Sequence, residues 1–284
     1  MREKDLKKIL DREISNDLKN INFNNLSKEK ILITGAEGSI GVALVDKLRE
    51  AENISFLPTD IVGGSDFLDV TNEDSVIKII KAFQPTMVVH LAGAKHAPEG
   101  EVDYWTTFNV NTIGTYNFIN NVNPDIKIVL ASTCKSANPE IVYGASKLIA
   151  ERMVLNTGGS VARFFNVIES SGNVFTIWDS VEENQPLEIA PKCERYFITI
   201  DEALGLLIYT MINEPGRYVV KNVELRTMGQ IVKDLYPDRV TKIIEPRRGD
   251  RLTEKFVASS ESIEKLCLND SIAKIISIHD YKSI

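Results

Sequence analysis

The chain has 284 residues, which is long for one simple domain and short for two full ones, so we expect a core domain with a smaller appended lobe. Lys and Arg total 33 and Asp and Glu total 40, and the resulting net charge of −7 argues against a protein that works on nucleic acid or an anionic membrane. An apolar share of 43% and a charged share of 26% are ordinary for a globular protein and exclude disorder over the whole chain.

The cysteines and histidines indicate neither a disulfide framework nor a metal site. The three cysteines are odd in number, far apart and without a CxxC pair, which favours a reducing, cytoplasmic location. The longest apolar stretch, 203–212, falls far short of the roughly 20 residues that span a bilayer, and the charged N-terminus does not look like a signal peptide. The residues concerned are Cys134, Cys193, Cys267, His90, His96 and His279.

Residues 1–29 are polar, with Leu6, Leu10 and Ile14 at helical spacing. This pattern predicts an N-terminal helical arm that packs on the domain behind it. A partner-binding arm is the alternative that the sequence leaves open.

From residue 30 onward, short apolar runs alternate with amphipathic stretches. Runs that are apolar nearly throughout are typical of strands buried on both faces. The alternation predicts an α/β fold, with a Rossmann domain built on a doubly wound parallel sheet over 30–166. The expected strands are 30–34, 54–58, 87–91, 127–131 and 161–165, and the expected helices are 40–50, 75–82, 105–120 and 145–155.

After Asn166 the regular alternation stops and prolines interrupt the chain. We expect 167–284 to form mainly a smaller C-terminal substrate-binding lobe over the carboxyl edge of the sheet, where open α/β sheets bind ligands. Helices are expected at 200–212 and 228–235. The pattern leaves open whether the chain crosses back to the Rossmann domain.

Three glycines follow the first strand at GxxGxxG spacing and lead into a helix. Between a strand and a helix, this spacing indicates a tight turn that lets the backbone approach a pyrophosphate at the helix N-terminus. The sequence therefore predicts a dinucleotide site. Its residues are Gly35, Glu37, Gly38, Ser39, Ile40 and Gly41.

Asp60 follows the second strand, where a carboxylate accepts hydrogen bonds from both ribose hydroxyls and repels a 2′-phosphate. No arginine lies close by in sequence, so NAD is favoured and NADP is the alternative. Asp69 and Val70 are placed to meet the adenine. A role at a helix N-terminus is the alternative for Asp69.

Tyr143 and Lys147 form a YxxxK pair at the start of a helix, where residues i and i+4 share one face. A lysine beside a tyrosine hydroxyl lowers the pKa of the phenol and can hold a nicotinamide ribose. Tyr143 is therefore the expected base that removes a proton from a sugar hydroxyl while hydride leaves the same carbon.

With these motifs the chain resembles the extended short-chain dehydrogenases/reductases. Within them it resembles the CapD-like UDP-N-acetylglucosamine 4,6-dehydratases of polysaccharide biosynthesis. The resemblance implies a bound NAD, a UDP-N-acetylhexosamine substrate and a homo-oligomer. It extends over about residues 30–257 and also rests on HLAGAKHAPEGE (90–101), NVNTIGT (109–115), STCKSANP (132–139), RFFNV (163–167) and EPRRGDRLTE (245–254).

The resemblance also implies a division of catalytic roles. Thr133 would bond the C4 oxygen, Tyr143 would deprotonate the C4 hydroxyl, and Lys135 would remove the C5 proton before water leaves from C6. Lys135 keeps the family's spacing to Tyr143. To act as a base it must be neutral, and burial beside Lys147 or Lys95 would lower its pKa accordingly.

Position 134 departs from the family pattern, because relatives carry there an Asp that assists departure of the C6 hydroxyl. Cys134 beside an ammonium is expected to tend towards the thiolate, which cannot donate a proton. The product is therefore open between a 4-keto-6-deoxy sugar and a 5,6-ene. A purely space-filling role for Cys134 is the alternative.

Other residues are implied to bind rather than react. Arginine suits bidentate diphosphate binding, Glu254 would accept from ribose hydroxyls, and Asn111 would support the active-site backbone. Lys95 and His96 resemble cofactor and sugar contacts rather than metal ligands. The substrate set is Lys95, His96, Asn166, Leu187, Arg247, Arg251 and Glu254, and the cofactor set adds Leu91, Ala92, Gly93 and Asn111 to those named above.

The sequence therefore predicts an NAD-dependent UDP-N-acetylglucosamine dehydratase that works through a 4-keto intermediate. A 4-epimerase or 4-reductase on the same fold is the first alternative, since these enzymes use YxxxK but need no lysine at 135. A non-catalytic nucleotide-binding Rossmann protein is the second, although such proteins typically lose a member of the Tyr–Lys pair and both are present here.

Overall fold

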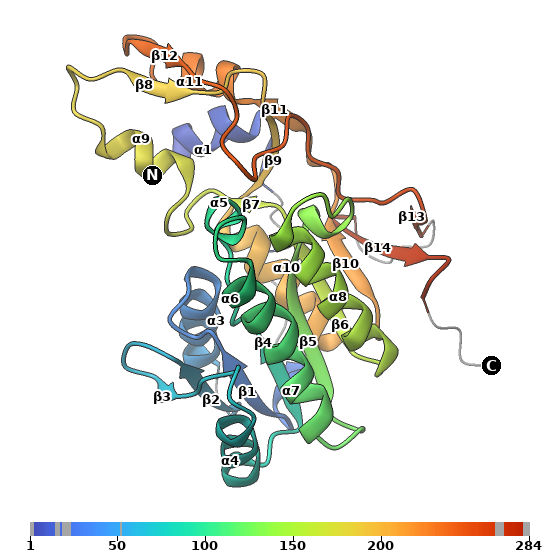
Figure 1. The fold of residues 1–284 in the computed structure, drawn as a ribbon. Coiled ribbons are helices and arrows are strands. Elements are labelled where there is room, and N and C mark those ends of the chain that lie inside the picture. Colours follow the sequence, from blue (N-terminus) through green and yellow to red (C-terminus); the bar gives the residue numbers. More distant parts are fainter. Residues whose placement is uncertain (1–2, 15–17, 19–23, 52, 265–269, 281–284) are drawn as a thin grey trace.

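The computed structural model describes residues 3–14, 18, 24–51, 53–264 and 270–280, which form a large sheet with a smaller lobe at one end (Figure 1). The nine strands of this sheet run in the order β13-β14-β10-β6-β5-β4-β1-β2-β3. Neighbours from β3 to β10 are parallel, whereas β14 is antiparallel to β10 and β13 is antiparallel to β14. The strands are β1 (Lys30–Thr34), β2 (Ser55–Asp60), β3 (Asp66–Phe67), β4 (Met87–His90), β5 (Lys127–Thr133), β6 (Ser160–Phe164), β10 (Arg217–Val220), β13 (Glu261–Ile263) and β14 (Ile272–Ser277).

Strand β1 explains why the apolar runs in the sequence have no polar alternation. Ile31 and Ile33 join the core on one face of the sheet, and Leu32 joins the core on the other. Leu32 pairs with Val88 of β4 and with Leu57 of β2. Because helices cover both faces, the three central positions of this strand, 31–33, are buried and apolar.

Two layers of helices cover the sheet (Figure 1). Helices α3 and α10 pack with the face that carries Ile31 and Ile33, and α4, α7 and α8 pack with the opposite face. This arrangement is the doubly wound architecture that alternating strands and helices produce. The helices are α3 (Ser39–Glu50), α4 (Glu73–Phe83), α5 (Ala97–Gly100), α6 (Tyr104–Phe108), α7 (Gly114–Asn121), α8 (Val142–Asn156) and α10 (Ile200–Ile212), with 3-10 turns η1 (Asn24–Leu26) and η3 (Cys134–Ser136) and a π turn η2 (Asn109–Ile113).

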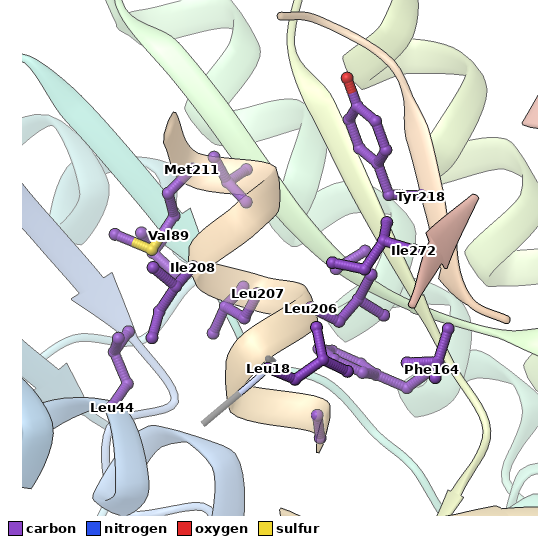
Figure 2. Close-up of a cluster of buried hydrophobic side chains, with 14 of the residues drawn as sticks. Leu18, Leu44, Val89, Phe164, Leu206, Leu207, Ile208, Met211, Tyr218 and Ile272 are labelled. Atoms are coloured by element: carbon purple, nitrogen blue, oxygen red, sulfur yellow. The ribbon is translucent and has the colours of Figure 1, made fainter. Parts of the chain in front are cut away.

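Helix α10 contributes a large part of one core, where its Leu206 and Met211 lie with Leu44 of α3 and Val89 of β4 (Figure 2). Its first turn is closed by a reciprocal capping box between Thr199 and Glu202. These residues are far from the glycine turn in sequence, so the later half of the chain completes the core of the earlier half.

The smaller lobe has its own apolar core, which includes Ile9, Trp178, Phe197 and Ile231. The N-terminal arm is helical over Glu3–Leu10 (α1) and packs against α11 of this lobe, and residues 15–17 and 19–23 of the arm lie outside the described residues. The lobe elements are α1 (Glu3–Leu10), α9 (Val174–Ser180), α11 (Met228–Leu235), the sheet β11-β9-β7 (Leu225–Thr227, Glu194–Ile198, Asn166–Val167) and the parallel pair β8 (Leu187–Ile189) and β12 (Thr241–Ile243).

The chain does not divide cleanly at residue 166. Residues 200–220 and 261–277 return to the large sheet and its helical layer as α10, β10, β13 and β14. The segment 167–284 thus serves both units, and several connections cross between the sheet and the lobe.

Candidate active site

The glycine turn after β1 forms a cradle at the start of α3. Gly35 has φ +69°, and a Cβ at this position would lie 2.5 Å from the Ala92 nitrogen, so only glycine fits between the two loops. Gly38 is the N-cap of α3 and has no side-chain cap, which leaves the first N–H groups of the helix for an anion. Ser39 and Ile40 form the first turn of that helix.

Asp60 is the last residue of β2, and its side chain is hydrogen bonded to the glycine turn. Its Oδ2 accepts the Glu37 N–H at 3.0 Å, and its Oδ1 accepts the Ile61 N–H at 2.7 Å. The Glu37 carboxylate in turn accepts the Ser65 N–H at 2.9 Å, and hydrogen bonding with the Ser65 side chain lowers the pKa of Glu37. The two predicted cofactor carboxylates thus also fix the loop after β2.

Asp69 and Val70 lie in the loop between β3 and α4, and both are predicted adenine contacts. The Asp69 Oδ1 accepts from the Thr71 N–H at 2.9 Å and the Thr71 hydroxyl at 2.7 Å, so Asp69 also stabilises this turn. The N-cap of α4 is Asn72 rather than Asp69. The carbonyl of buried Val70 accepts from Asn117 of α7 at 2.9 Å.

Asn111 lies in the π turn η2 and is fully buried. Its side chain accepts the Ala94 N–H at 2.9 Å and donates to the Ala94 carbonyl and the Ser146 hydroxyl, each at 3.0 Å. A Cβ on Gly93 would lie 2.9 Å from the Lys147 Nζ and 3.0 Å from the Asn111 Oδ1. Asn111 therefore supports the loop after β4, which comprises Leu91, Ala92 and Gly93.

Tyr143 and Lys147 lie on one face of α8, next to the end of β5. Burial raises the pKa of Tyr143, while the charge of Lys135 and a hydrogen bond with the Thr133 side chain oppose that rise. The pKa of Tyr143 is thus raised on balance rather than lowered, and the cation that most opposes the rise is Lys135. The Lys147 Nζ donates to the Ala131 carbonyl at 3.1 Å.

Lys135 is not the neutral lysine that the sequence argument required. Its Nζ lies 2.7 Å from the Glu254 Oε1 and donates to the Asn166 Oδ1 at 3.1 Å. Burial lowers the pKa of Lys135, but the adjacent Glu254 carboxylate, together with Cys134 and Tyr143, raises it, and the net shift is upward. Lys135 is thus an ammonium, and the expected depression of its pKa by a neighbouring cation is wrong.

Cys134 is fully buried in the apolar cluster on the α3–α10 face. Burial raises the pKa of its thiol to about 12, Glu254 adds to the rise, and Lys135 opposes it. The expected tendency towards a thiolate is therefore wrong, because desolvation outweighs the nearby ammonium. This environment supports the space-filling alternative.

A cavity of about 860 Å³ opens between the carboxyl edge of the sheet and the lobe. Lys135 reaches it from the turn after β5, Asn166 from β7, Lys95 and His96 from the loop after β4, and Arg247 from the segment after β12. Its other end is apolar and lies in the lobe. That wall includes Val174, Phe175, Ile177, Trp178, Ile189 and Phe197.

Three residues of the predicted substrate set do not line this cavity. Leu187 is buried in the lobe core and its N–H donates to Val240, so β8 already uses that group. Glu254 is paired with Lys135. The buried Arg251 guanidinium makes no hydrogen bond within the described part of the chain, and Glu140 lies 3.8 Å from it. The substrate roles of these three side chains stay predictions.

Several polar residues near the site were not predicted from the sequence. Glu151, one further helical turn from Lys147, lies fully buried between α8 and β6. Arg195 lies 3.6 Å from Glu254, and Ser171 accepts from Lys95 through its carbonyl oxygen at 3.0 Å. A signal for Glu151 existed in the spacing Tyr143, Lys147, Glu151, whereas nothing in the sequence ties Arg195 or Ser171 to the site.

Among the residues that the structure describes, no three His, Cys, Asp or Glu side chains are grouped so that they could hold a metal ion. Over the same ranges, no helix combines the length and apolar character needed to cross a membrane.

The fold and the Tyr–Lys pair define the class of protein as an extended short-chain dehydrogenase/reductase with a Rossmann domain, and the predicted α/β fold is confirmed. Among solved structures, the X-ray structure of Pen from Bacillus thuringiensis is similar, with a TM-score of 0.76, 20% identity and 90% coverage of each chain. At that identity the likeness concerns the fold alone.

Within this class, the chain belongs to the family of polysaccharide biosynthesis proteins, whose model matches residues 56–275. It is 30% identical over 240 residues to the probable polysaccharide biosynthesis protein EpsC of Bacillus subtilis, covering 74% of this chain but only 40% of that relative. It is 24% identical over 265 residues to an inverting UDP-N-acetylglucosamine 4,6-dehydratase of Campylobacter jejuni, covering 83% of this chain and 79% of that enzyme.

Proposed function

We propose that this protein is a nicotinamide-dependent UDP-N-acetylglucosamine dehydratase, which removes water across C5–C6 through a 4-keto intermediate. The observation that carries the proposal is the position of Lys135. The Lys135 side chain lines the cavity, and its charge acts on the neighbouring Tyr143. An epimerase or reductase would need no lysine at position 135. The relationship to a 4,6-dehydratase of Campylobacter jejuni supports the same class of reaction.

The residues around the glycine turn fit a nicotinamide dinucleotide. Gly35 leaves room for close backbone approach, and Gly93 leaves room beside the Lys147 ammonium. Asp60, with no arginine hydrogen bonded to it among the described residues, favours NAD over NADP. When bound, the cofactor supplies an acceptor for the C4 hydride and returns that hydride later in the cycle.

In the first step, Tyr143 takes the proton of the sugar C4 hydroxyl as hydride leaves C4. The Lys135 charge and the Thr133 hydrogen bond both favour the phenolate form of Tyr143, against the effect of burial. Thr133 lies at the end of β5, where its hydroxyl can also contact the C4 oxygen. The resulting 4-ketone acidifies the proton on C5.

In the second step, Lys135 acts as a proton shuttle rather than as a neutral base. The C5–H and C6–O bonds break and a C5–C6 double bond forms. Lys135 gives one proton to the departing C6 hydroxyl, which leaves as water, and takes up the C5 proton. The lysine therefore ends the step as the ammonium that it was at the start, a state that the Glu254 carboxylate stabilises.

The first prediction is that purified protein, incubated with UDP-N-acetylglucosamine in D₂O, converts the sugar with loss of water and of its C5 proton, as followed by proton NMR. A C6 methyl singlet, uncoupled because C5 carries deuterium, indicates the 4-keto-6-deoxy product. Vinyl signals of a C6 methylene, with no hydrogen at C5, indicate the 5,6-ene. Inversion at C4 with the C5 proton retained would instead establish a 4-epimerase. No change with either NAD or NADP added would favour a non-catalytic nucleotide-binding protein.

The variant Lys135→Gln provides the internal test, since glutamine can still bond Glu254 and Asn166. We expect C5 exchange to fall by roughly 10²-fold or more while UDP-sugar binding persists. Lys47→Gln is the matched control, because Lys47 forms an exposed pair with Glu50 at 2.8 Å on α3 and should leave turnover unchanged. Exchange retained in Lys135→Gln would place the proton transfer elsewhere.

A further inference from the structure

Glu151 is a buried carboxylate on the same helix face as the Tyr–Lys pair. Tyr143, Lys147 and Glu151 follow one another at intervals of one helical turn on α8, so they share one side of the helix. The Glu151 side chain is fully buried. A charge in that position is costly unless several groups bond it, and the environment supplies them.

Two serines bind Glu151 from the turn that carries the other catalytic candidates. The hydroxyls of Ser132 and Ser136 each donate to the Glu151 Oε1 at 2.5 Å. These serines flank Thr133 and Lys135. Glu151 thereby ties the turn after β5 to the helix that carries Tyr143 and Lys147.

Two buried arginines bind the same carboxylate from the sheet. Arg163 of β6 and Arg217 of β10 lie 2.6 and 2.9 Å from the Glu151 Oε2. Arg163 also donates to the Phe256 carbonyl at 2.8 Å and pairs with Glu261 of β13 at 2.7 Å. The network therefore reaches residues 254–261, the segment whose Glu254 pairs with Lys135.

The charge of Glu151 also acts on Lys147. Burial lowers the pKa of Lys147 to about 8, and the Glu151 carboxylate opposes that fall. The other titratable side chain that interacts with Lys147 is His90 of β4, which burial and Lys147 keep neutral by lowering its pKa to about 3. The cations that face Glu151 are Arg163 and Arg217, and Glu261 faces those arginines from β13.

We propose that Glu151 is a positioning residue. Through its bonds to Ser132 and Ser136 it holds the turn of Thr133 and Lys135 against α8, and from one helical turn away it places a negative charge near Lys147. Its role for the cofactor and substrate rests on the proposed function, whereas its effect on Lys147 does not. A lysine holds a ribose and favours a phenolate best as an ammonium.

The second prediction is that Glu151→Gln moves the titration midpoint of Lys147 downward by about one pH unit or more, because the opposing carboxylate is lost. The measurement is an NMR titration of protein with lysine labelled at ¹³Cε, in which Lys147→Arg assigns the signal. The dissociation constant of NAD should rise with pH through the same midpoint, and at lower pH in Glu151→Gln than in wild type.

Two further variants separate this role from simple support of the fold. Glu261→Gln removes a second carboxylate from Arg163 and from Arg217, which also pairs with Asp280 at 3.3 Å, so it should destabilise the protein without lowering the Lys147 midpoint. Arg217→Gln removes a cation from Glu151 and should raise the midpoint, and this opposite sign remains testable if Glu151→Gln does not fold.

An unchanged Lys147 midpoint in Glu151→Gln, or equal downward shifts in Glu151→Gln and Glu261→Gln, would overturn the proposal. An upward shift in Arg217→Gln would support it. If the midpoints move as expected but NAD does not bind, the positioning role of Glu151 stands and the proposed function fails.

Discussion

Asp60 is the residue on which the choice between NAD and NADP rests. Both of its carboxylate oxygens accept backbone N–H groups, so the side chain is held in place before any ligand arrives. The third prediction is that Asp60→Asn raises the affinity for NADP relative to NAD by about tenfold, since the repulsion of a 2′-phosphate is lost while acceptor capacity remains. Dissociation constants for both dinucleotides, measured by calorimetry, provide the test.

Asp66 gives a matched control for that substitution. It is an exposed aspartate on β3, paired in register with Thr59 next to Asp60. Asp66→Asn removes the same charge from the same sheet edge and should leave the ratio of the two affinities in place. A wild-type protein that binds NADP more tightly than NAD would contradict the assignment of Asp60.

The candidate catalytic residues could be predicted because they lie close together in sequence. Thr133, Lys135, Tyr143 and Lys147 come from the end of one strand and the next helix, so spacing alone brings them together. Their charge states could not be predicted. The partner of Lys135 is Glu254, which arrives from a distant segment, and the pKa of a buried group depends on partners that spacing does not reveal.

At the scale of elements, the helix expected over 105–120 is interrupted by the π turn η2. This turn carries Asn111, whose side chain satisfies both backbone groups of Ala94. The fourth prediction is that Asn111→Ala weakens NAD binding about tenfold and lowers the free energy of unfolding by about 2 kcal/mol, because the partly buried Ala94 backbone groups lose their partners. Chemical denaturation and NAD titration measure the two effects.

Asn121 of α7 is the control for Asn111. Its side chain donates to Glu73 at 2.9 Å near the surface, away from the loop after β4. Asn121→Ala should therefore cost little stability and leave NAD binding unchanged. Equal losses of binding in the two variants would mean that Asn111 has no special role in placing that loop.

Long periodic elements were predictable, and their connections were not. The strand expected at 30–34 and the helices expected at 200–212 and 228–235 have the predicted bounds. A π turn leaves no signature in apolar spacing, since it depends on the side-chain bonds of one residue. The return of residues 261–277 to the sheet was left open because β13 has only three residues and nothing in the sequence of β14 indicates that it pairs with β10.

At the scale of the whole molecule, buried ionisable groups make stability depend on pH. Burial lowers the pKa of His90 from 6.5 to about 3, so below pH 6.5 the unfolded chain takes up a proton that the folded protein refuses. The pKa of Glu151 is about 2 instead of 4.5, because although burial raises it, Arg163 and other partners lower it by more. Below pH 4.5 the unfolded chain therefore binds a second extra proton.

The fifth prediction is that the free energy of unfolding falls as pH decreases below 6.5, by about 1.4 kcal/mol per pH unit for the His90 proton, and more steeply below 4.5. Urea denaturation between pH 7 and pH 4 measures the slope. His90→Gln should flatten it between pH 6.5 and 4.5, whereas His279→Gln, at an exposed position, should not. Identical slopes in all three proteins would show that His90 is protonated in the folded state.

The antiparallel return of β13 and β14 has a consequence for the order in which the protein matures during synthesis. A ribosome completes the glycine turn, α8 and β6 long before it adds Glu261. Until then Arg163 and Arg217 share Glu151 without Glu261, and before residue 254 has been added Lys135 has no Glu254 to pair with. The nascent Rossmann half is therefore an assembly with excess buried positive charge. The buried charges are balanced only when the last strands of the sheet have been translated and have packed against β10.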